Sequence, residues 1–353
     1  MKKYLLLPLT AFIFLLSCIE QVELPYRNEE PILVVEGGIT NEPPPYTLKL
    51  SYSGKFLAGN TISSNLAVNG ARVTLISDRG DSVRFEQNLY QAALYQTDLF
   101  YRGQVGRSYT LRIEMPDGKV YKTTPQLMKP VPSITSVYAD KIDNFIRFYI
   151  DTSDPENSTD YYQWKGYSIS FKITEAVTVA AFSSSSISNA LNSGCHTYCW
   201  AYNNIDVANV FADTYINGKS IKKRLVLYSP IEKDAPNAQH FAEIKQLSIS
   251  RESYVFWQQY EEQRTRTGSI FDPLPATIIG NVVNEANDKD FALGFFEVAA
   301  VSTKRFLADP RSLVFSKEAN NDILPPPVNN VRPKADCDIY YPLYGCTPPT
   351  NWK

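Results

Sequence analysis

The sequence predicts a mostly β protein, with an N-terminal immunoglobulin-like sandwich followed by a larger β domain that carries one main α-helix. Three observations support this prediction. The chain holds 23 Tyr and 18 Phe, which favour strands, while 23 Pro and 16 Gly interrupt it every few residues. Several short segments alternate apolar and polar residues with a period of two. One segment has the apolar spacing of a helix and a capping residue before it.

The chain begins with the layout of a bacterial lipoprotein signal. Two lysines precede the apolar run Leu5–Leu16, whose length of about 12 residues is below the roughly 20 that a membrane-spanning helix needs. A serine then precedes Cys18, which we expect to become a lipidated N-terminus. An ordinary secretory signal with an incidental cysteine is the alternative. We therefore predict a signal peptide over residues 1–17 and a lipidated, polar tether over 18–30.

The first predicted domain covers residues 31–128 and consists of short strands. The segment 31–40 is apolar and ends in glycines, and 46–52 places its aromatic and leucine residues on one face. Residues 73–85 and 109–124 each predict a hairpin, because Asp-Arg-Gly-Asp and Pro-Asp-Gly turns separate alternating runs. This density of strands predicts an immunoglobulin-like or related sandwich.

A second, larger β domain is predicted over residues 133–315. The preceding Lys129-Pro130-Val131-Pro132 forms a stiff extended connector, because proline restricts its own φ and the residue before it. The C-terminal segment 316–353 is proline-rich, and we expect a disulfide to hold it. Strands in the second domain are expected over residues 145–150, 161–173, 225–228, 276–283 and 291–302.

The helix is predicted over Arg251–Thr267, residues 251–267. Ser250 is a suitable N-cap, and Glu252 lies in the first turn, where the helix dipole favours an acidic side chain. Tyr254 and Trp257 begin an apolar face with helical spacing.

Four cysteines remain after Cys18, and an even number in an exported chain favours two disulfides. They are Cys195, Cys199, Cys337 and Cys346. Adjacency in the sequence suggests pairing within each local pair, but the crossed pairings stay open. Because His196 lies between the first two cysteines, a zinc site is the sharper alternative, although the spacing differs from a standard zinc knuckle. Unpaired thiols are the third interpretation.

The charge of the chain narrows the classes of partner. The 35 Lys and Arg nearly balance the 37 Asp and Glu, for a formal net charge of −2, and basic runs are absent from the sequence. This balance argues against nucleic acid as a partner and against a polybasic membrane patch. Since the sequence has no second apolar stretch of spanning length, the lipid at Cys18 is the predicted membrane attachment.

The sequence offers no recognised catalytic motif. A nucleophile elbow, a phosphate-binding glycine loop and a His-Glu-x-x-His motif are all absent from it. The two histidines, His196 and His240, lie outside any known motif, and we interpret both as structural. We therefore predict no catalytic residue, no metal ligand, and no cofactor other than the covalent lipid.

Two acidic clusters still raise the question of a metal. The first consists of Asp151, Asp154, Glu156 and Asp160, and the second of Asn284, Glu285, Asn287, Asp288 and Asp290. Solvated turns are the simplest interpretation of both. Calcium coordination is one alternative, because that ion prefers oxygen ligands, and a carboxylate-based hydrolase is the other.

A glycine- and proline-containing segment and a group of aromatic residues are candidate contact surfaces. Residues 268–281 are interpreted as a connector that docks the helix on the sheet, with a partner surface as the alternative. Exposed Tyr and Trp rings stack on sugars and anchor interfaces, although core packing is their commoner role in strands. The candidate ligand or partner contacts are Tyr161, Tyr162, Trp164, Trp200 and Asp272.

Six segments of this sequence carry a resemblance to a known family. They are the lipobox at Cys18 and the segments Ile32–Asn41, Gly106–Ile113, Asp154–Tyr162, Gly268–Asn281 and Ala292–Glu297. Together they resemble an uncharacterised family of Bacteroidota outer-membrane lipoproteins, domain of unknown function 4249. The resemblance implies a place beside TonB-dependent receptors, and it supplies no catalytic residues.

These observations predict a non-catalytic lipoprotein of the outer membrane, exposed at the cell surface. It is expected to act as an accessory or ligand-capturing partner of a TonB-dependent receptor or of another outer-membrane complex. An independent glycan- or peptide-binding surface lipoprotein is one alternative, and a carboxylate-based hydrolase is the second.

Overall fold

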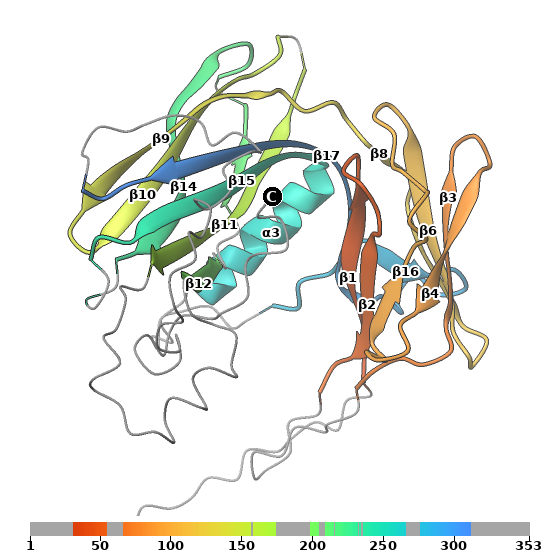
Figure 1. The fold of residues 1–353 in the computed structure, drawn as a ribbon. Helices are drawn as coiled ribbons and strands as arrows, with labels where there is room; N and C mark the ends of the chain where they lie inside the picture. Colours follow the sequence, from red (N-terminus) through yellow and green to blue (C-terminus); the bar gives the residue numbers. More distant parts are fainter. Residues whose placement is uncertain are drawn as a thin grey trace, which may run out of the picture.

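The computed structural model describes most of the two predicted β regions. The described residues are 31–54, 66–156, 158–173, 198–204, 209–214, 216–231, 233, 236–265 and 276–311. They confirm a mostly β chain with one α-helix (Figure 1). The lipidation site Cys18, three of the four other cysteines and Asp272 lie outside these residues. Among the described residues, no helix is long and apolar enough to cross a bilayer.

The N-terminal strands form one half of a long curled sheet. Their order is β1-β2-β5-β4-β3-β6-β7-β16, and β8 pairs with β6. The hairpins β3–β4 and β6–β7 form where the turn sequences predict them. The bounds are β1 (Leu33–Thr40), β2 (Thr47–Tyr52), β3 (Arg72–Ser77), β4 (Ser82–Gln87), β5 (Leu94–Gln96), β6 (Ser108–Glu114), β7 (Val120–Thr123), β8 (Gln126–Leu127) and β16 (Val282–Asn284).

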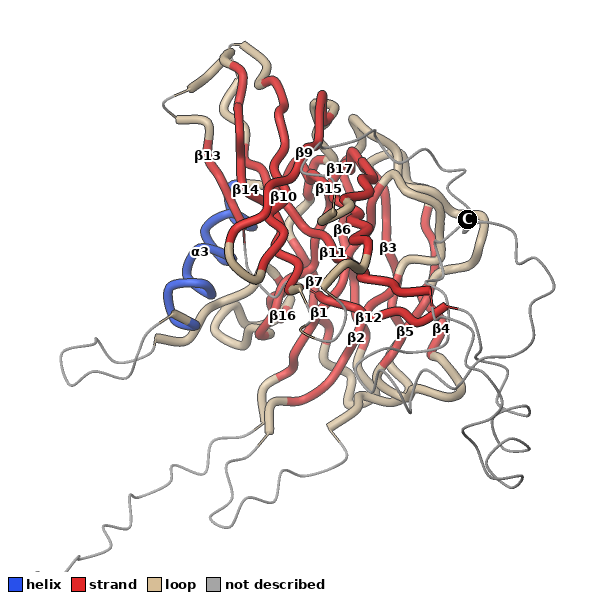
Figure 2. The backbone as a smooth tube through the Cα atoms, turned by 60° about the vertical axis from the view of Figure 1, so that its left-hand side comes forward, coloured by secondary structure: helices blue, strands red, loops and turns tan. Residues whose placement is uncertain are grey.

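The second half of the chain builds two layers. The long sheet continues as β1-β17-β15-β11-β12, with β13 beside β11, and a separate three-stranded sheet has the order β14-β10-β9. Figure 2 shows the strands of this region and the single helix at its side. The bounds are β9 (Ile134–Ile142), β10 (Phe145–Ser153), β11 (Tyr161–Ile173), β12 (Tyr198–Asn204), β13 (Asn209–Ala212), β14 (Ser220–Pro230), β15 (Gln239–Ile249) and β17 (Leu293–Ala308).

Each half has its own hydrophobic core, made by the alternation of residues along the strands. The first core lies inside the curled sheet and includes Leu48, Leu75 and Leu111, none of which is accessible to solvent. The second lies between the three-stranded sheet and the long sheet, where Phe148 meets Phe306 edge to face. Burial of these side chains is the main stabilising contribution to each half.

Strand β17 belongs to both halves. Its first part pairs in parallel with β1, from Val34 opposite Leu293 to Thr40 opposite Ala299, and its second part pairs antiparallel with β15. The ion pair between Glu42 Oε2 and Lys245 Nζ, at 2.8 Å, also joins the two halves. The first core also includes residues from β16 and β17, which follow the predicted boundary at residues 129–132 in the sequence. That boundary and the immunoglobulin-like character of residues 31–128 stay predictions.

The helix α3 (Arg251–Arg264) begins where the sequence predicts. The Ser250 hydroxyl accepts a hydrogen bond from the Ser253 backbone N–H at 3.1 Å, which satisfies one of the free donors of the first turn. Phe256 is buried and its ring lies 5.2 Å from that of Phe295 on β17. The helix contacts β11, β13 and β17, so it covers one face of the long sheet.

The strand predicted over residues 276–283 is wrong for most of its length. Only β16, three residues long, is a strand, and 276–281 run without regular pairing. The Asn281 side chain replaces a strand partner, because it donates to the Phe296 carbonyl at 2.8 Å and accepts from the Phe296 N–H at 2.9 Å. The strand predicted over 291–302 exists and continues to Ala308, since β15 pairs with it along that length.

Candidate functional site

A cleft of about 790 Å³ lies between α3 and the long sheet. We call it the α3 cleft. Its floor is the junction of β1 and β17, with Lys165 of β11 at one side, and its walls are α3 and residues 276–278. Figure 1 shows α3 lying against the sheet beside β1. Clefts that bind small ligands or peptide segments commonly have this size and position.

Three charged residues, Glu36, Lys165 and Glu297, line the α3 cleft. Burial raises the pKa of Glu297, and the nearby Lys165 and Ser253 only partly oppose the rise. Burial also lowers the pKa of Lys165, against the attraction of Glu297. The Lys165 side chain is crowded by protein atoms but reaches solvent through the open cleft. The exposed ammonium group of Lys165 is therefore the member of this pair that a polar group of a ligand can reach, since the Glu297 side chain is buried.

The helical wall of the cleft is aromatic. Trp257 and Tyr260 meet edge to face at 5.7 Å, and Phe256 packs against Trp257 at 5.2 Å. The ammonium group of Lys165 lies 5.3 Å from the centre of the Trp257 ring, within the range of a cation–π interaction. Tyr260 keeps 45% of its surface exposed, so this wall is available to a bound molecule.

Glycines form much of the floor of the cleft. A Cβ at Gly38 would lie 2.4 Å from the Glu297 carbonyl oxygen, and one at Gly294 would lie 2.3 Å from that of Val35. Gly294 also has a φ of +81°, which side chains other than glycine rarely adopt. The close approach of β1 and β17 therefore requires these glycines and leaves backbone at the floor.

The described end of the predicted connector contacts both the helix and the sheet. Gln263 of α3 donates to the Ala276 carbonyl at 2.5 Å, and Asn281 holds the backbone of Phe296. One contact joins this segment to the helix and the other joins it to the sheet, as we expect for a connector over residues 268–281. Residues 276–278 also line the cleft.

Three of the five predicted contact residues have described side chains, and two of these are buried. Tyr162 and Trp164 are each 1% exposed, because β11 turns them toward the second core. The prediction that they contact a ligand is therefore corrected to a core role. Tyr161 packs against Tyr254 of α3 at 5.2 Å. Trp200 lies in β12, but its side chain, like Asp272, is outside the described part.

The two acidic clusters differ. Asp154 and Asp160 are buried, so the solvated-turn interpretation is wrong for both. In the second cluster, Asp290 accepts hydrogen bonds from Tyr121 at 3.0 Å and from Asn284 at 2.8 Å. The Asp290 carboxylate thus has hydrogen-bond donors from the protein itself, which fits a structural role for this polar loop.

His240 is fully buried in β15. Its Nδ1 lies 2.7 Å from the Ser229 hydroxyl oxygen of β14, and burial lowers its pKa to about 4. A serine beside a histidine can serve as a nucleophile and its base, but a substrate must reach the serine. Because both side chains have no solvent exposure, the pair fits the predicted structural role. His196 lies outside the described residues.

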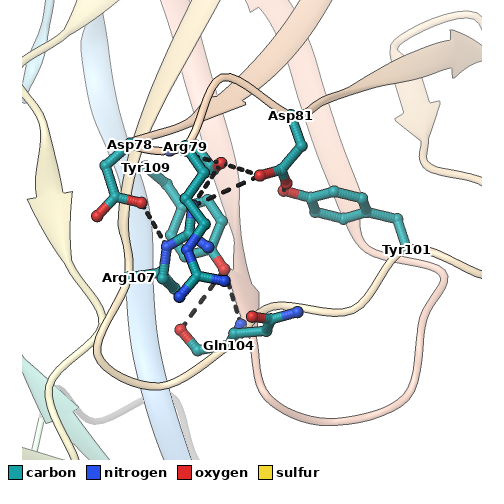
Figure 3. Close-up of polar contacts among 8 residues, drawn as sticks. Asp78, Arg79, Asp81, Tyr101, Gln104, Arg107 and Tyr109 are labelled. Carbon is teal, nitrogen blue, oxygen red and sulfur yellow. Dashed lines mark hydrogen bonds and ion pairs between the residues drawn. The ribbon is translucent and has the colours of Figure 1, made fainter.

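The segment Gly106–Ile113, which contributes to the family resemblance, stabilises the end of the first hairpin. Figure 3 shows Arg107 pointing between Asp78 and Asp81 of the β3–β4 turn. The Arg107 guanidinium hydrogen-bonds to Asp78 and, at 2.9 Å, to the Ser77 hydroxyl. These bonds lower the pKa of Asp78, with Arg107 as the main cause. Arg107 thus has a structural role in this chain.

Sequence reasoning missed the charged residues of the α3 cleft. Lys165 and Glu297 lie 132 positions apart in the chain and meet only because β11 and β17 belong to one sheet. A usable signal existed at Glu297, since a lone carboxylate within the apolar run Phe-Phe-Glu-Val-Ala-Ala is unusual for a buried strand.

Comparison with known proteins shows the family of this chain and a likeness to a distant solved structure. No curated protein matches the chain. A solved DUF4785 family protein from Legionella pneumophila aligns with 8% identity and a TM-score of 0.20, over 61% of this chain and 52% of that one. This chain thus spans about half the length of that protein. The family described as Domain of unknown function (DUF4249) matches residues 19–305, most of the sequence, and the chain belongs to this family.

Proposed function

We propose that this protein is a non-catalytic lipoprotein of the outer membrane, anchored through Cys18 and exposed at the cell surface. In this proposal it acts as an accessory or ligand-capturing subunit of a TonB-dependent receptor or of another outer-membrane complex. The signal layout before Cys18 supports the anchoring. The observation that carries the binding role is the α3 cleft.

The α3 cleft has the features of a binding site. Its volume of about 790 Å³ falls within the range of roughly 300–1,000 Å³ that is typical of ligand pockets. Trp257 and Tyr260 offer apolar surface, while the exposed Lys165 and Glu36 offer a charge of each sign. A molecule with an apolar body and a polar or charged group, such as a peptide segment, matches this lining.

The carboxylates of the cleft favour binding over hydrolysis. Glu297 is buried, and its Oε2 accepts a hydrogen bond from the Ser253 hydroxyl. Glu36 is exposed and lies 3.2 Å from the ammonium group of Lys49. Of these two carboxylates only Glu36 is exposed to a substrate, whereas a carboxylate-based hydrolase needs an acid and a base that both reach the substrate.

An independent glycan or peptide binder is the second candidate. The aromatic wall favours it, because exposed rings such as that of Tyr260 stack on sugar faces and on apolar side chains. The two candidates share the α3 cleft and differ in whether binding needs another membrane protein.

Co-purification from membranes solubilised in mild detergent tests the proposal. We expect the wild-type protein to recover an outer-membrane protein, and Tyr260→Ala to reduce the yield by about tenfold, as loss of a contact worth about 1.4 kcal/mol does. The matched control is Tyr228→Ala, because Tyr228 is 46% exposed, like Tyr260 at 45%, but lies on the three-stranded sheet.

Two results would contradict the accessory role. Recovery of the protein alone would show that it has no stable membrane partner. Equal yields from the two tyrosine variants would show that the α3 cleft does not form the contact. If the protein is recovered alone, binding of the purified form to a glycan array or peptide pool would support the second candidate.

A further inference from the structure

A second site outside the α3 cleft forms where three strands end. Asp154 directly follows β10, Asp160 directly precedes β11, and Asp213 directly follows β13. Pairing of β11 with β13 places Tyr161 opposite Ala212, and the Asp213 N–H donates to the Asp160 carbonyl at 3.1 Å. One carboxylate oxygen from each aspartate lies within 4.8 Å of the others.

Two of these carboxylates have protein donors. Asp154 accepts from the Tyr162 hydroxyl at 2.7 Å and from the Gly218 N–H at 3.0 Å. Asp160 accepts from the Ser158 hydroxyl and lies 3.5 Å from the Lys129 ammonium group. These bonds fix the two side chains in place and leave part of their oxygen lone pairs free.

Asp213 has no such donor. It is 1% exposed, and neither of its carboxylate oxygens has a hydrogen-bond partner among the described residues. Burial, with the two other aspartates, raises the pKa of Asp213. A buried carboxylate without donors is costly, because it has lost water and gained nothing in its place.

The charge and geometry of this group match one kind of ligand. Three carboxylates carry −3, and Lys129 supplies +1, which leaves −2 for a bound cation to balance. All the donors are oxygens, which hard cations prefer. Ca²⁺ takes six to eight oxygen ligands at about 2.3–2.6 Å in flexible geometry, so three oxygens that lie within 4.8 Å of one another can contact one ion, whereas Mg²⁺ demands near-ideal octahedral geometry at about 2.0–2.1 Å.

We infer that Asp154, Asp160 and Asp213 form a Ca²⁺ site. This differs from the expectation of no metal and goes beyond the proposed function, because none of the three residues lines the α3 cleft. The ion would tie the ends of β10, β11 and β13 together at the edge of the second core. Its role is therefore to stabilise the fold of that half, with waters completing the coordination.

Calcium titration of the full chain, purified in mild detergent and freed of metal with EDTA, tests this inference. We expect CaCl₂ at about 100 times its dissociation constant to raise the melting temperature by about 5–10 °C, and MgCl₂ at the same concentration to have a much smaller effect. Titration calorimetry on the same sample measures the stoichiometry, which should be one ion per chain.

Two variants separate a calcium site from a buried aspartate that only holds a proton. Asp213→Asn should abolish the calcium-dependent shift and melt no lower than the calcium-free wild type. Asp151→Asn removes the same charge nearby and should keep the shift, because Asp151 is engaged by Lys222 and Lys223 outside the cluster. Absence of heat and of a shift in the wild type, or a full shift in Asp213→Asn, would overturn the inference.

Discussion

Gly294→Ala is expected to destabilise the protein by about 2–5 kcal/mol, through a left-handed φ and a backbone clash. Gly294 has a φ of +81° and lies where β17 meets β1. A Cβ there would lie 2.3 Å from the Val35 carbonyl oxygen, a distance that real Cβ atoms do not tolerate. Because β1 is paired with β2 on its other side, its backbone has little room to relax, and the junction that forms the floor of the α3 cleft should open.

Gly80→Ala is the matched control for this variant. Gly80 has a φ of +87°, nearly the same as Gly294, but a Cβ there would meet nothing within 4 Å. We expect it to lower the unfolding free energy by only about 1–2 kcal/mol. Urea denaturation of both variants measures the difference, and equal losses would show that the close approach of β1 and β17 contributes nothing.

Trp164→Ala is the second large effect, with an expected loss of about 3–5 kcal/mol of unfolding free energy. The ring lies 6.2 Å from Tyr162 and 6.0 Å from Phe211, and the Arg224 guanidinium lies 5.0 Å from its centre. Its indole N–H donates to Gln246 Oε1 at 3.0 Å. Removing the side chain therefore leaves a cavity in the second core and takes away the indole donor of the buried Gln246 Oε1.

Thermal and urea denaturation measure this loss, with Trp164→Phe as the conservative variant. The phenylalanine keeps most of the packing and loses the bond to Gln246, so an intermediate loss of about 1–3 kcal/mol is expected. If the Trp164→Ala protein kept its stability but lost binding, Trp164 would be a surface contact, and its assignment to the core would be wrong.

Local patterns in the sequence were sufficient to predict much of the fold. Alternating residues predicted the strands over 46–52 and 109–115, turn residues predicted the hairpins over 73–85 and 109–124, and Ser250 with Glu252 marked the start of α3. These features depend on neighbours within about ten residues, and the energies that decide them are local. The strand predicted at 276–281 failed because a side chain, Asn281, took over the bonding of the backbone.

The sites depend on contacts between distant residues and were harder to predict. Lys165 and Glu297 meet only through the shared sheet. Asp213 lies 53 residues after Asp160, and only the pairing of β11 with β13 brings the two together. For Tyr162 and Trp164 of β11, the sequence suggested a contact site where the structure has core. Alternation shows that one face of a strand is buried but does not say which face.

Photo-crosslinking at the α3 cleft tests the central claim, that this cleft is where the protein contacts its partner or ligand. A photoreactive phenylalanine derivative would replace Tyr260 in one strain and Tyr228 in another, with mass spectrometry of the products after irradiation of intact cells. The proposal predicts a defined adduct from position 260 and none from position 228, although the two tyrosines are equally exposed. Absence of an adduct at 260, or the same adduct at both positions, would contradict it.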